Sequence, residues 1–391
     1  MAKKAEEIIN DMQTELDTYF QDSKSESMIE PDVIQQSTGI EAIDLLTGGI
    51  ALGTLTQITG YPGSFKSTIA SQIAAHAKRL DARTPIVYMD TEVTMQAERI
   101  NRLGLMGVKP RFNYTIETIL SDIQVMYNFK ESKKLLDIPA VMIWDSVVNT
   151  PTKAGLATLD PTKTIGLLPK IISQKLPQLL ITMKLANISL IAINQFRDKM
   201  DMGMFAPPSD LKHLASDKVL PGGNSLAYNT AQLFQCAVKT SYTGEKETDP
   251  YGKRATIIYF KTVKNKFTMP DNHTIELVVD PITGVDNLLT NYEVLKKQGK
   301  INASGWSSLK DAPEHKFRLK SIHETYETNL QFKEAFDKVV TDTYKELKSK
   351  LLSEKPVELC EKPVGEVAKE LDELDTQLNE MLNNPELPSE Q

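Results

Sequence analysis

Residues 55 to 80 read LTQITGYPGSFKSTIASQIAAHAKRL, and this stretch decides the fold of the chain. The apolar and β-branched beginning, LTQIT, predicts a buried strand, and the end, TIASQIAAHAKRL, predicts a helix. Gly60 and Gly63 lie between the two and permit a tight turn. Because backbone N–H groups at a helix N-terminus attract anions, a strand, a turn and a helix in this order predict a phosphate-binding loop.

This loop contains the side chains that bind a nucleoside triphosphate, with one departure from the usual motif. Lys66 is suited to the outer phosphates, and the Ser67 hydroxyl is suited to Mg²⁺. Phe65 stands where the motif has glycine, and a positive φ there costs a non-glycine residue about 1 kcal/mol or more. That cost is small beside the roughly 8 kcal/mol of a micromolar ligand, so we expect ATP to bind with the Phe65 ring turned away. The predicted ATP-binding residues of the loop are Gly60, Tyr61, Pro62, Gly63, Ser64, Phe65, Lys66, Ser67 and Thr68.

Length and composition limit the remaining possibilities. A chain of 391 residues that is 40% hydrophobic can bury one large α/β core and still leave tails or a small second domain. We expect no membrane span, because no run of about 18 apolar residues occurs, and the N-terminal residues lack the apolar core of a signal peptide. The two cysteines, Cys236 and Cys360, are far apart, and the histidines show no metal-ligand spacing. These features predict a cytoplasmic, reduced protein whose only metal is an ion that accompanies the nucleotide.

The charge is unevenly distributed along the chain. The net charge is −7, but residues 1–31 hold three Lys against eight Asp or Glu, and residues 351–391 hold three Lys against eleven. Residues 32–350 therefore carry a net charge of +6. A moderately basic body between acidic ends is compatible with phosphate contacts.

Strand and helix patterns alternate along the first half of the chain. Apolar runs at residues 55–58, 86–90, 140–145 and 189–194 are separated by helical patterns, which predicts a parallel sheet with helices on both faces. Three further strand-like runs, AQLFQCAV, ATIIYFKTV and TIELVV, suggest antiparallel strands appended to this sheet. We expect four parts: an N-terminal helix and linker (1–31), an α/β core (32–285), a helical C-terminal region (286–350) and an acidic, disordered tail (351–391).

Polar side chains follow three of the predicted parallel strands. Asp145 ends AVMIWD, where it could hold the water shell of Mg²⁺ opposite Ser67. Glu92 follows IVYMD and could activate water for attack on a γ-phosphate, while Asn194 and Gln195 end a third strand and could contact that phosphate. A single Asp at a strand end is more often a helix cap or turn residue. Several polar groups at the carboxyl ends of neighbouring strands are instead typical of a site in an open α/β sheet.

Two long segments after these strands have the composition of nucleic-acid-binding loops. Between Gln195 and Gly222 lie 26 residues, too long and too polar for a plain connection. A second segment, NTPTKAGLATLDPTKT, follows Asp145. The alternative for both is a solvated insert, but cations and aromatic rings together suit contact with a DNA backbone and its bases. The candidate DNA-binding residues are Lys153 and Lys163 in the shorter segment and Phe196, Arg197, Lys199, Phe205, Lys212 and Lys218 in the longer one.

In this order the motifs resemble those of the RecA recombinases, and within them the bacteriophage UvsX-type branch, whose phosphate loops also carry Phe before the lysine. The resemblance runs from about residue 37 to about residue 289, roughly two-thirds of the chain. The segments that carry it are STGIEAID, MDTE, the strand end at Asp145, INQFRDKM, PGGNS and KTVKNK. It implies a RecA-like P-loop ATPase core: a mostly parallel sheet with helices on both faces and appended antiparallel strands.

The resemblance also assigns roles to residues. It implies that Glu92 is the catalytic glutamate, that Asp145 belongs to the magnesium site with Ser67, and that Gln195 senses the γ-phosphate. The lysines of KTVKNK, Lys264 and Lys266, are similar to lysines that reach the nucleotide of a neighbouring subunit. Other implied residues are Lys66 as a catalytic cation, Arg99 at the position that usually stacks on adenine, with Gln96 nearby, and Gly222 and Gly223 at the end of the second DNA-binding loop.

The residue patterns predict an ATPase that uses ATP and Mg²⁺ and contacts DNA, and the resemblance implies that it is a DNA-dependent ATPase that forms filaments on single-stranded DNA and pairs it with homologous duplex DNA. The DNA-binding loops are expected at about 151–165 and 196–221. The apolar stripe of residues 1–31 either folds back on its own core or packs on a neighbouring subunit, and the resemblance implies the second, in head-to-tail contacts. The acidic tail is either a solvated segment or a DNA mimic that competes for the basic body. Single-strand-binding and mediator proteins are possible partners, and a phage protein would act in the host-cell cytoplasm.

Two other functions share part of this pattern. A hexameric helicase has the same core but would be expected to use an arginine finger, and it would form closed rings in electron micrographs instead of filaments. A nucleotide-binding scaffold in which Phe65 abolishes hydrolysis would show no ATP turnover stimulated by single-stranded DNA.

Overall fold

The structure is a computed structural model that describes residues 33–112, 114–158, 160, 162, 164, 166–198, 218–241, 255–267, 269–303 and 306–353. The expected N-terminal helix and nearly all of the acidic tail lie outside the described residues. The same holds for four of the candidate DNA-binding residues, namely Lys163, Lys199, Phe205 and Lys212, and for the side chain of Lys218.

An eight-stranded sheet forms the centre of the molecule, as the α/β pattern predicts. Its order is β12-β11-β10-β9-β3-β6-β5-β4. The parallel strands are β3 (Leu55–Gly60), β4 (Ile86–Asp90), β5 (Ala140–Asp145), β6 (Ile188–Asn194) and β9 (Gln232–Ser241). The antiparallel strands are β10 (Thr256–Asn265), β11 (Thr274–Asp280) and β12 (Gly284–Val285).

One detail of the predicted sheet is wrong. The three later strands were expected to be antiparallel additions, but β9 runs parallel to β3, and the antiparallel part begins only at β10. The segment before β9 is long enough to return to the start of the sheet through a short helix, α8 (Gly223–Asn229), so no hairpin forces β9 to run the other way.

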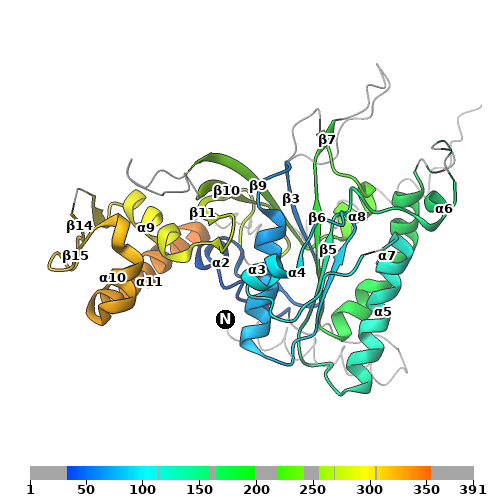
Figure 1. The fold of residues 1–391 in the computed structure, drawn as a ribbon, viewed down its shortest axis with the longest axis horizontal. Coiled ribbons are helices and arrows are strands. Elements are labelled where there is room, and N and C mark those ends of the chain that lie inside the picture. Colours follow the sequence, from blue (N-terminus) through cyan, green and yellow to red (C-terminus); the bar gives the residue numbers. More distant parts are fainter. Residues whose placement is uncertain are drawn as a thin grey trace, which may run out of the picture.

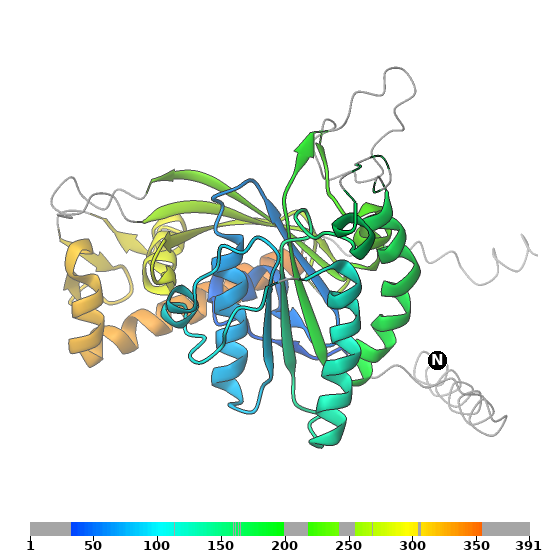
Figure 2. The same ribbon diagram turned by 45° about the vertical axis from the view of Figure 1, so that its right-hand side comes forward.

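Helices cover both faces of this sheet (Figure 1). Strand residues alternate between two core clusters: Val141 and Ile143 of β5 lie with α2 (Glu41–Thr47) and α3 (Lys66–Leu80), whereas Met142 and Trp144 lie with α5 (Ile116–Ser132) and α7 (Leu167–Leu185). Because successive side chains of a strand point to opposite faces, this continuous apolar run fills both layers. Figure 2 shows α3 and α5 on either side of the strands. The short helices α4 (Ala97–Arg102) and α6 (Lys153–Leu156) follow β4 and β5.

Short strands pair at two places outside the sheet. β1 (Gln35–Gln36) pairs with β2 (Ile50–Ala51) before the core. β7 (Arg197–Asp198) and β8 (Lys218–Val219) form an antiparallel pair that brings the two ends of the second predicted loop together. No helix in the described part of the chain combines the length and the apolar content needed to cross a membrane.

The C-terminal region was expected to be helical, and this expectation was incomplete. It contains α9 (Asn287–Lys297), the 3₁₀ helix η3 (Leu319–Ser321), α10 (Ile322–Thr328) and α11 (Leu330–Ser353). It also contains a three-stranded sheet of β13 (Ile301–Asn302), β14 (Ser307–Leu309) and β15 (Lys316–Phe317). Strands of two or three residues are too short to give a periodic signal. Phe317, Phe332 and Phe336 belong to the separate core of this region.

Candidate active site

The predicted phosphate-binding loop connects the end of β3 to the start of α3. Gly60 has φ of 152°, and a Cβ atom there would lie 2.3 Å from the carbonyl oxygen of Cys236 on the neighbouring strand β9, so only glycine fits. Phe65 has φ of 61° and ψ of 21°, which is the left-handed conformation that the sequence predicted to be costly. Its ring packs against the core cluster on the α3 face, which agrees with the expectation that the ring faces away from a bound phosphate.

Two polar side chains of α3 are buried next to this loop. Lys66 is 6% exposed, and its Nζ donates hydrogen bonds to the carbonyl oxygen of Tyr61 at 2.7 Å and to Oγ of Ser64 at 3.4 Å. Burial lowers the pKa of Lys66 from its ordinary value, so an anion beside it would favour the charged form. The hydroxyl of Thr68 is buried and has no hydrogen-bond partner within the described residues. Both groups suit a polar, anionic ligand at the helix N-terminus.

The structure brings Asp145 and Ser67 together, as predicted for a magnesium site. Asp145 ends β5, is 5% exposed, and accepts a hydrogen bond of 2.6 Å from the Tyr88 hydroxyl and another from Ser67. Burial is the main cause that raises the pKa of Asp145 to about 6. A carboxylate and a hydroxyl are oxygen ligands of the kind that Mg²⁺ prefers, and a bound cation would offset the cost of burying the charge. The donor set therefore fits Mg²⁺ together with a nucleotide.

Glu92 is held in place by the loop that follows β4. Oδ1 of Asp90 accepts hydrogen bonds from the backbone N–H groups of Glu92 at 3.0 Å and Val93 at 2.8 Å, and Oδ2 accepts one from Met95 at 2.8 Å. Thr91 adds a link to β5, because its hydroxyl donates to the carbonyl oxygen of Ser146 at 2.8 Å. These bonds fix the backbone under the Glu92 carboxylate.

Three donors meet on one oxygen of Glu92. Oε1 accepts hydrogen bonds from Oγ of Ser146 at 2.7 Å, Nδ2 of Asn149 at 2.9 Å and Nε2 of Gln195 at 2.9 Å. Within the described part of the chain, no hydrogen bond falls on Oε2. One oxygen therefore anchors the side chain, and the other can accept a proton from water.

Asn194 does not have the role that its position at a strand end suggested. Its side chain is fully buried, and Nδ2 donates to the carbonyl oxygen of Pro221 at 2.8 Å and to Oε1 of Gln57 at 3.3 Å. Asn194 thus ties the end of β6 to the end of the second predicted DNA-binding loop. It is a structural residue, whereas the next residue, Gln195, reaches Glu92.

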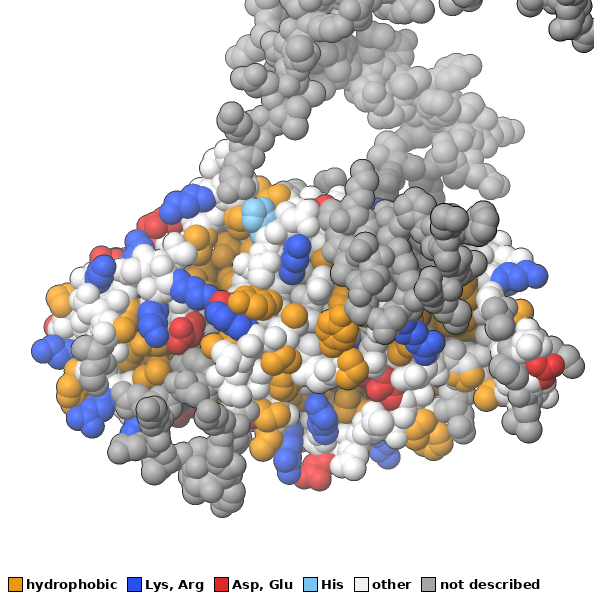
Figure 3. All heavy atoms as spheres, turned by 90° about the horizontal axis from the view of Figure 1, so that it is seen from above, with side chains coloured by type: hydrophobic (Ala, Val, Ile, Leu, Met, Phe, Trp, Pro, Cys, Tyr) orange, Lys and Arg blue, Asp and Glu red, His pale blue; other side chains and the backbone are white. Residues whose placement is uncertain are grey.

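The starts of the two predicted DNA-binding loops lie side by side. Nη2 of Arg197, at the start of the longer loop, donates a hydrogen bond of 3.3 Å to the carbonyl oxygen of Val148, which immediately precedes the shorter one. The ring of Phe196 lies 5.5 Å from that of Tyr61 in the phosphate-binding loop, edge to face. Lys153 is exposed at the N-terminus of α6. Figure 3 views this end of the molecule from above and shows Lys and Arg side chains distributed among hydrophobic ones.

The glycine pair and the lysine pair that the family resemblance singled out meet at α8. This helix begins at Gly223 with Gly222 as its N-cap, so the second loop leads directly into it. At its other end, Nζ of Lys264 donates to the carbonyl oxygens of Ala227 at 3.0 Å and Tyr228 at 3.2 Å, and Nζ of Lys266 donates to that of Tyr228 at 3.3 Å. In the isolated chain the two cations therefore cap the C-terminus of α8.

A small hollow beside α4 contains the residue predicted to stack on the base. Arg99 and Gln96 line a cavity of about 190 Å³ together with Pro281 and Ile282, which follow β11. Glu98 and Arg102, which pair with each other, also line this space. Pro281 and Ile282 gave no recognisable sequence signal, whereas Arg99 and Gln96 were named from the sequence.

Other residues of the site were also missed from the sequence. Asn149 belongs to a segment that was chosen for its lysines, and Tyr88 lies in the interior of a strand. Asp90 ends the strand IVYMD two residues before Glu92, and this position at a strand end could have identified it as a cap for the following loop.

The loop at residues 60–67, the buried carboxylate at the end of β5 and the polar groups after β4 and β6 define a RecA-like α/β protein with a candidate phosphate-binding loop. The family described as the RecA N-terminal domain matches residues 23–280 of the chain. Since this match covers more than half of the sequence, the chain belongs to the RecA family.

Individual relatives are distant. The chain is 24% identical over 324 residues to the mitochondrial DNA repair protein recA homolog of Dictyostelium discoideum, covering 82% of this chain and 64% of that protein. It is 27% identical over 246 residues to Protein RecA of Geobacter sulfurreducens, covering 61% of this chain and 65% of that protein. It is 26% identical over 208 residues to the DNA repair and recombination protein RadA of Metallosphaera sedula, covering 51% and 64%. The chain thus spans less than two-thirds of these relatives' length.

Among solved structures, the crystal structure of the RadB recombinase aligns with 64% of this chain and 97% of that chain, at 20% identity and a TM-score of 0.44. This similarity is too low to add to the family assignment.

Proposed function

We propose that the chain is an ATP-dependent recombinase that forms filaments on single-stranded DNA and catalyses homologous pairing and strand exchange. The observation that supports this most directly is the convergence of Asn149 and Gln195 on Oε1 of Glu92. Asn149 is the first residue of the shorter candidate DNA-binding segment, and Gln195 immediately precedes the longer one. A single carboxylate therefore contacts the chain at the start of both loops and lies in the same site as the predicted phosphate-binding loop.

In this proposal, hydrolysis of the phosphoanhydride bond of ATP is the only covalent chemistry. Lys66, Ser67 and Asp145 would hold ATP and Mg²⁺, and Mg²⁺ would withdraw charge from the phosphate oxygens. Glu92 orients a water molecule through Oε2 and accepts its proton. Strand exchange breaks no covalent bond, and the sequence of the DNA is recognised by base pairing.

Coupling between the nucleotide and the DNA would pass through the hydrogen bonds of Glu92. When the hydrogen-bond partners of Glu92 change during hydrolysis, Gln195 and Asn149 lose or gain their bond to this carboxylate. The starts of the two loops, which follow these residues, can then shift. The bond between Arg197 and Val148 makes the two starts move as a unit. Such a device supports tight DNA binding with ATP and weaker binding with ADP.

Lys264 and Lys266 are proposed to act on the nucleotide of the neighbouring subunit. Their contacts with α8 in the isolated chain do not exclude this, because among the described residues both ammonium groups bind only backbone carbonyl oxygens. Burial, and next the charge of Lys266, lower the pKa of Lys264, so an anionic phosphate would be a better partner than these carbonyl groups. If the two lysines moved from the C-terminus of α8 to the neighbour's nucleotide, their movement would act on α8 and thus on the end of the second loop, which leads into this helix.

A surface suited to head-to-tail assembly lies at the β4 edge of the sheet. β4 is the last strand in the order, and outside it only Arg111 pairs with it among the described residues. Next to this edge is a cavity of about 550 Å³ that is lined by Ile86, Met106, Val108 and Phe129 and by four cations, Lys78, Arg83, Lys109 and Arg111. Met106 is 71% exposed. An apolar and basic surface of this kind complements the apolar stripe and the charge of −5 of residues 1–31 of another copy.

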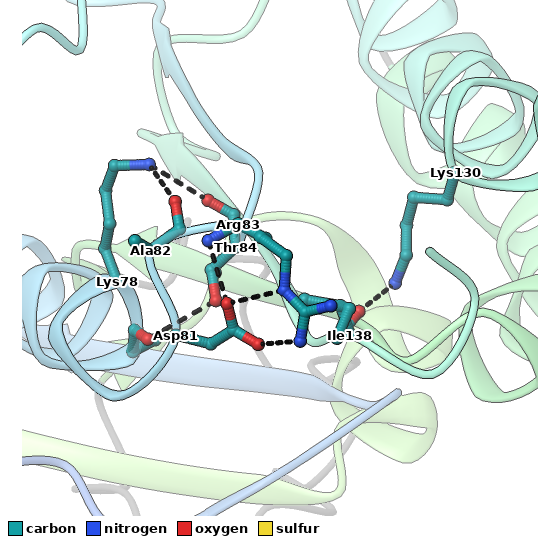
Figure 4. Close-up of polar contacts among 8 residues, drawn as sticks. Lys78, Asp81, Ala82, Arg83, Thr84, Lys130 and Ile138 are labelled. Carbon is teal, nitrogen blue, oxygen red and sulfur yellow. Dashed lines mark hydrogen bonds and ion pairs between the residues drawn. The ribbon is translucent and has the colours of Figure 1, made fainter. Parts of the chain in front are cut away.

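Figure 4 shows how two of these cations are held. Nζ of Lys78 donates to the carbonyl oxygens of Ala82 at 3.2 Å and Thr84 at 3.3 Å, while Arg83 pairs with Asp81 at 2.7 Å. Nearby, Lys130 is fully buried and bonded to the carbonyl oxygens of Ile138 and Ala186, so it supports the fold and does not belong to this surface.

The proposal is tested by binding single-stranded DNA in the presence of ATP-γ-S, ADP or no nucleotide, with ATP turnover measured in parallel. We expect the tightest binding with ATP-γ-S, turnover that single-stranded DNA stimulates, and extended filaments in electron micrographs. Closed rings would favour the helicase alternative. Turnover that DNA does not stimulate would remove the enzymatic part of the proposal.

A mixing experiment tests the role of Lys264 in the neighbouring subunit. Chains with Glu92→Gln and chains with Lys264→Ala should each be nearly inactive alone. Mixed filaments contain interfaces with Glu92 from one chain and Lys264 from the next, so about a quarter of wild-type turnover should return, as expected for random head-to-tail contacts. No recovery in filaments shown to contain both chains would contradict action between subunits.

We also propose that the chain belongs to the UvsX-type branch of the family, on the basis of Phe65 immediately before Lys66. Single-strand-binding and mediator proteins are proposed partners, and a cytoplasmic location is proposed with them.

A further inference from the structure

An apolar groove lies between the core sheet and the C-terminal region, away from the candidate active site. It has a volume of about 500 Å³, within the range of roughly 300–1,000 Å³ that is typical of binding pockets. Its walls come from α2, β10, β11, α9 and α11, which lie together in Figure 1. The apolar lining residues are Leu45, Leu46, Tyr259, Ile275, Val294, Leu347 and Leu351. Tyr259 is 37% exposed, so the groove is open to a partner.

The chain leaves the described structure at this groove. α11 ends at Ser353, and Leu347, Lys350 and Leu351 in its last turns line the groove. The remaining residues, 354–391, therefore start beside it. The ten residues 354–363 can span at most about 35 Å when extended, which is enough for the following segment to turn back.

The segment 364–382, VGEVAKELDELDTQLNEML, has the spacing of an amphipathic helix. Its acidic composition alone suggests a solvated tail, but its apolar residues recur at alternating steps of three and four: Val364, Val367, Leu371, Leu374, Leu378 and Met381. Pro363 precedes the segment and NNP follows it, which are start and stop signals for a helix. An isolated helix of this length is marginal in water, so its apolar stripe needs a partner surface.

The charges of the groove and the segment are complementary. Residues 364–382 hold six Asp or Glu against one Lys. At the groove, Glu276 is already paired with Lys239 at 2.5 Å and Lys297 at 2.7 Å. Lys350 lines the groove and has no ion-pair partner among the described residues, and Lys296 lies beside Glu293 at 3.9 Å. In the lining the two lysines, Lys297 and Lys350, equal the two carboxylates in number, and the partners Lys239 and Lys296 next to those carboxylates add two further cations. This excess of cations around the groove favours an acidic helix over a basic one.

We infer that residues 364–382 of the same chain bind in this groove as a helix. The apolar stripe covers the groove, and the acidic face meets the lysines at its rim. The bound segment connects α11 to β10, the strand that contains Lys264 and ends one residue before Lys266, and so holds the C-terminal region against the core. This inference does not depend on the proposed recombinase activity.

Hydrogen exchange of the full-length chain tests the inference. We expect residues 364–382 to exchange at least tenfold more slowly than in a variant that carries Leu371→Ala, Leu374→Ala and Leu378→Ala. This variant keeps every charge and a high helix propensity, so only the apolar stripe is removed. It should also increase exchange at residues 274–280 and 347–353, because the groove loses its cover.

A second pair of variants tests the groove side. Tyr259→Ser should abolish the slow exchange of residues 364–382, whereas Val238→Ser, which removes an apolar side chain that is 52% exposed on the neighbouring strand but outside the groove, should not. The slow exchange should be independent of protein concentration. The inference would be overturned by rapid exchange of the segment in the wild type, or by unchanged exchange of residues 274–280 and 347–353 in the triple variant. Protection that vanishes on dilution would also overturn it, in favour of a second copy as the partner.

Discussion

The side-chain amide of Gln195 donates a hydrogen bond of 2.9 Å to Oε1 of Glu92, 103 residues earlier in the chain. This bond crosses β5, because β6 and β4 lie on either side of β5 in the sheet. Glu92 and Gln195 follow β4 and β6 at the same edge, and the parallel direction of the strands brings them together. The proposed catalytic carboxylate is therefore in direct contact with Gln195, the residue that immediately precedes the longer candidate DNA-binding loop.

Glu92→Gln should reduce ATP turnover by at least about a hundredfold, because an amide cannot accept the proton of the attacking water. Binding of single-stranded DNA with ATP-γ-S should be retained, since the loops keep their other contacts. Steady-state turnover and gel shifts measure the two effects separately. Turnover equal to that of the wild type would show that another group is the base.

Asn149→Ala should weaken the coupling between DNA and hydrolysis. A hydrogen bond to a charged acceptor contributes about 1.5–3 kcal/mol, so the DNA-stimulated turnover should fall by roughly tenfold or more, while turnover without DNA changes less. The matched control is Asn128→Ala, which removes an exposed hydrogen bond to Gln124 on α5. Equal losses with and without DNA would assign Asn149 a purely structural role.

Substitutions of Phe65 should separate backbone strain from packing. Phe65→Gly and Phe65→Ala both lose the packing of the ring, but only alanine keeps the cost of the left-handed conformation at φ of 61°. The glycine variant should therefore be more stable than the alanine variant by about 1 kcal/mol in urea unfolding. If the alanine variant were the more stable one, the loop would relax out of this conformation.

The pair His323 and Asp286 should give a small pH dependence of stability. Nε2 of His323 lies 2.8 Å from Oδ2 of Asp286, and this hydrogen bond raises the pKa of His323 above 6.5. Because the folded state binds the proton more tightly, the stabilisation is complete below the unfolded pKa and is lost as the pH rises through the folded value. Both groups are partly exposed, so the contribution should stay below about 1 kcal/mol.

Urea unfolding of the wild type and His323→Gln at several pH values checks this effect. The difference in unfolding free energy between the two proteins should shrink as the pH increases from about 6 to 8.5, because His323 of the wild type becomes neutral over this range. A difference that stays constant or grows over this range would contradict the assigned charge state.

The strands of the core illustrate what local patterns can predict. The runs IVYMD and AVMIWD match β4 and β5 residue for residue, because a strand that is buried on both faces is continuously apolar and ends where polar residues begin. The direction of β9 was not predictable in this way. A strand has the same residue pattern whether its neighbour runs parallel or antiparallel.

Asn194 and Gln195 show the same limit within the site. Both are polar residues at the end of one strand, and the sequence could not distinguish them. In the structure Asn194 is buried against Pro221, and Gln195 reaches Glu92, because neighbouring residues of an extended chain point in opposite directions. Asn149 was missed because its partner is 57 residues away.

The sequence by itself determined that a strand, a glycine turn and a helix follow one another around residues 60–67, in the order that predicts a phosphate-binding loop, and that carboxylates end two neighbouring strands, since these are properties of local spacing. Only the tertiary structure decided which polar groups share Oε1 of Glu92, that Lys264 caps α8, and that α11 ends at an apolar groove. Those relationships join residues far apart along the chain, and the packing of one sheet with its two helical layers sets the distances between them.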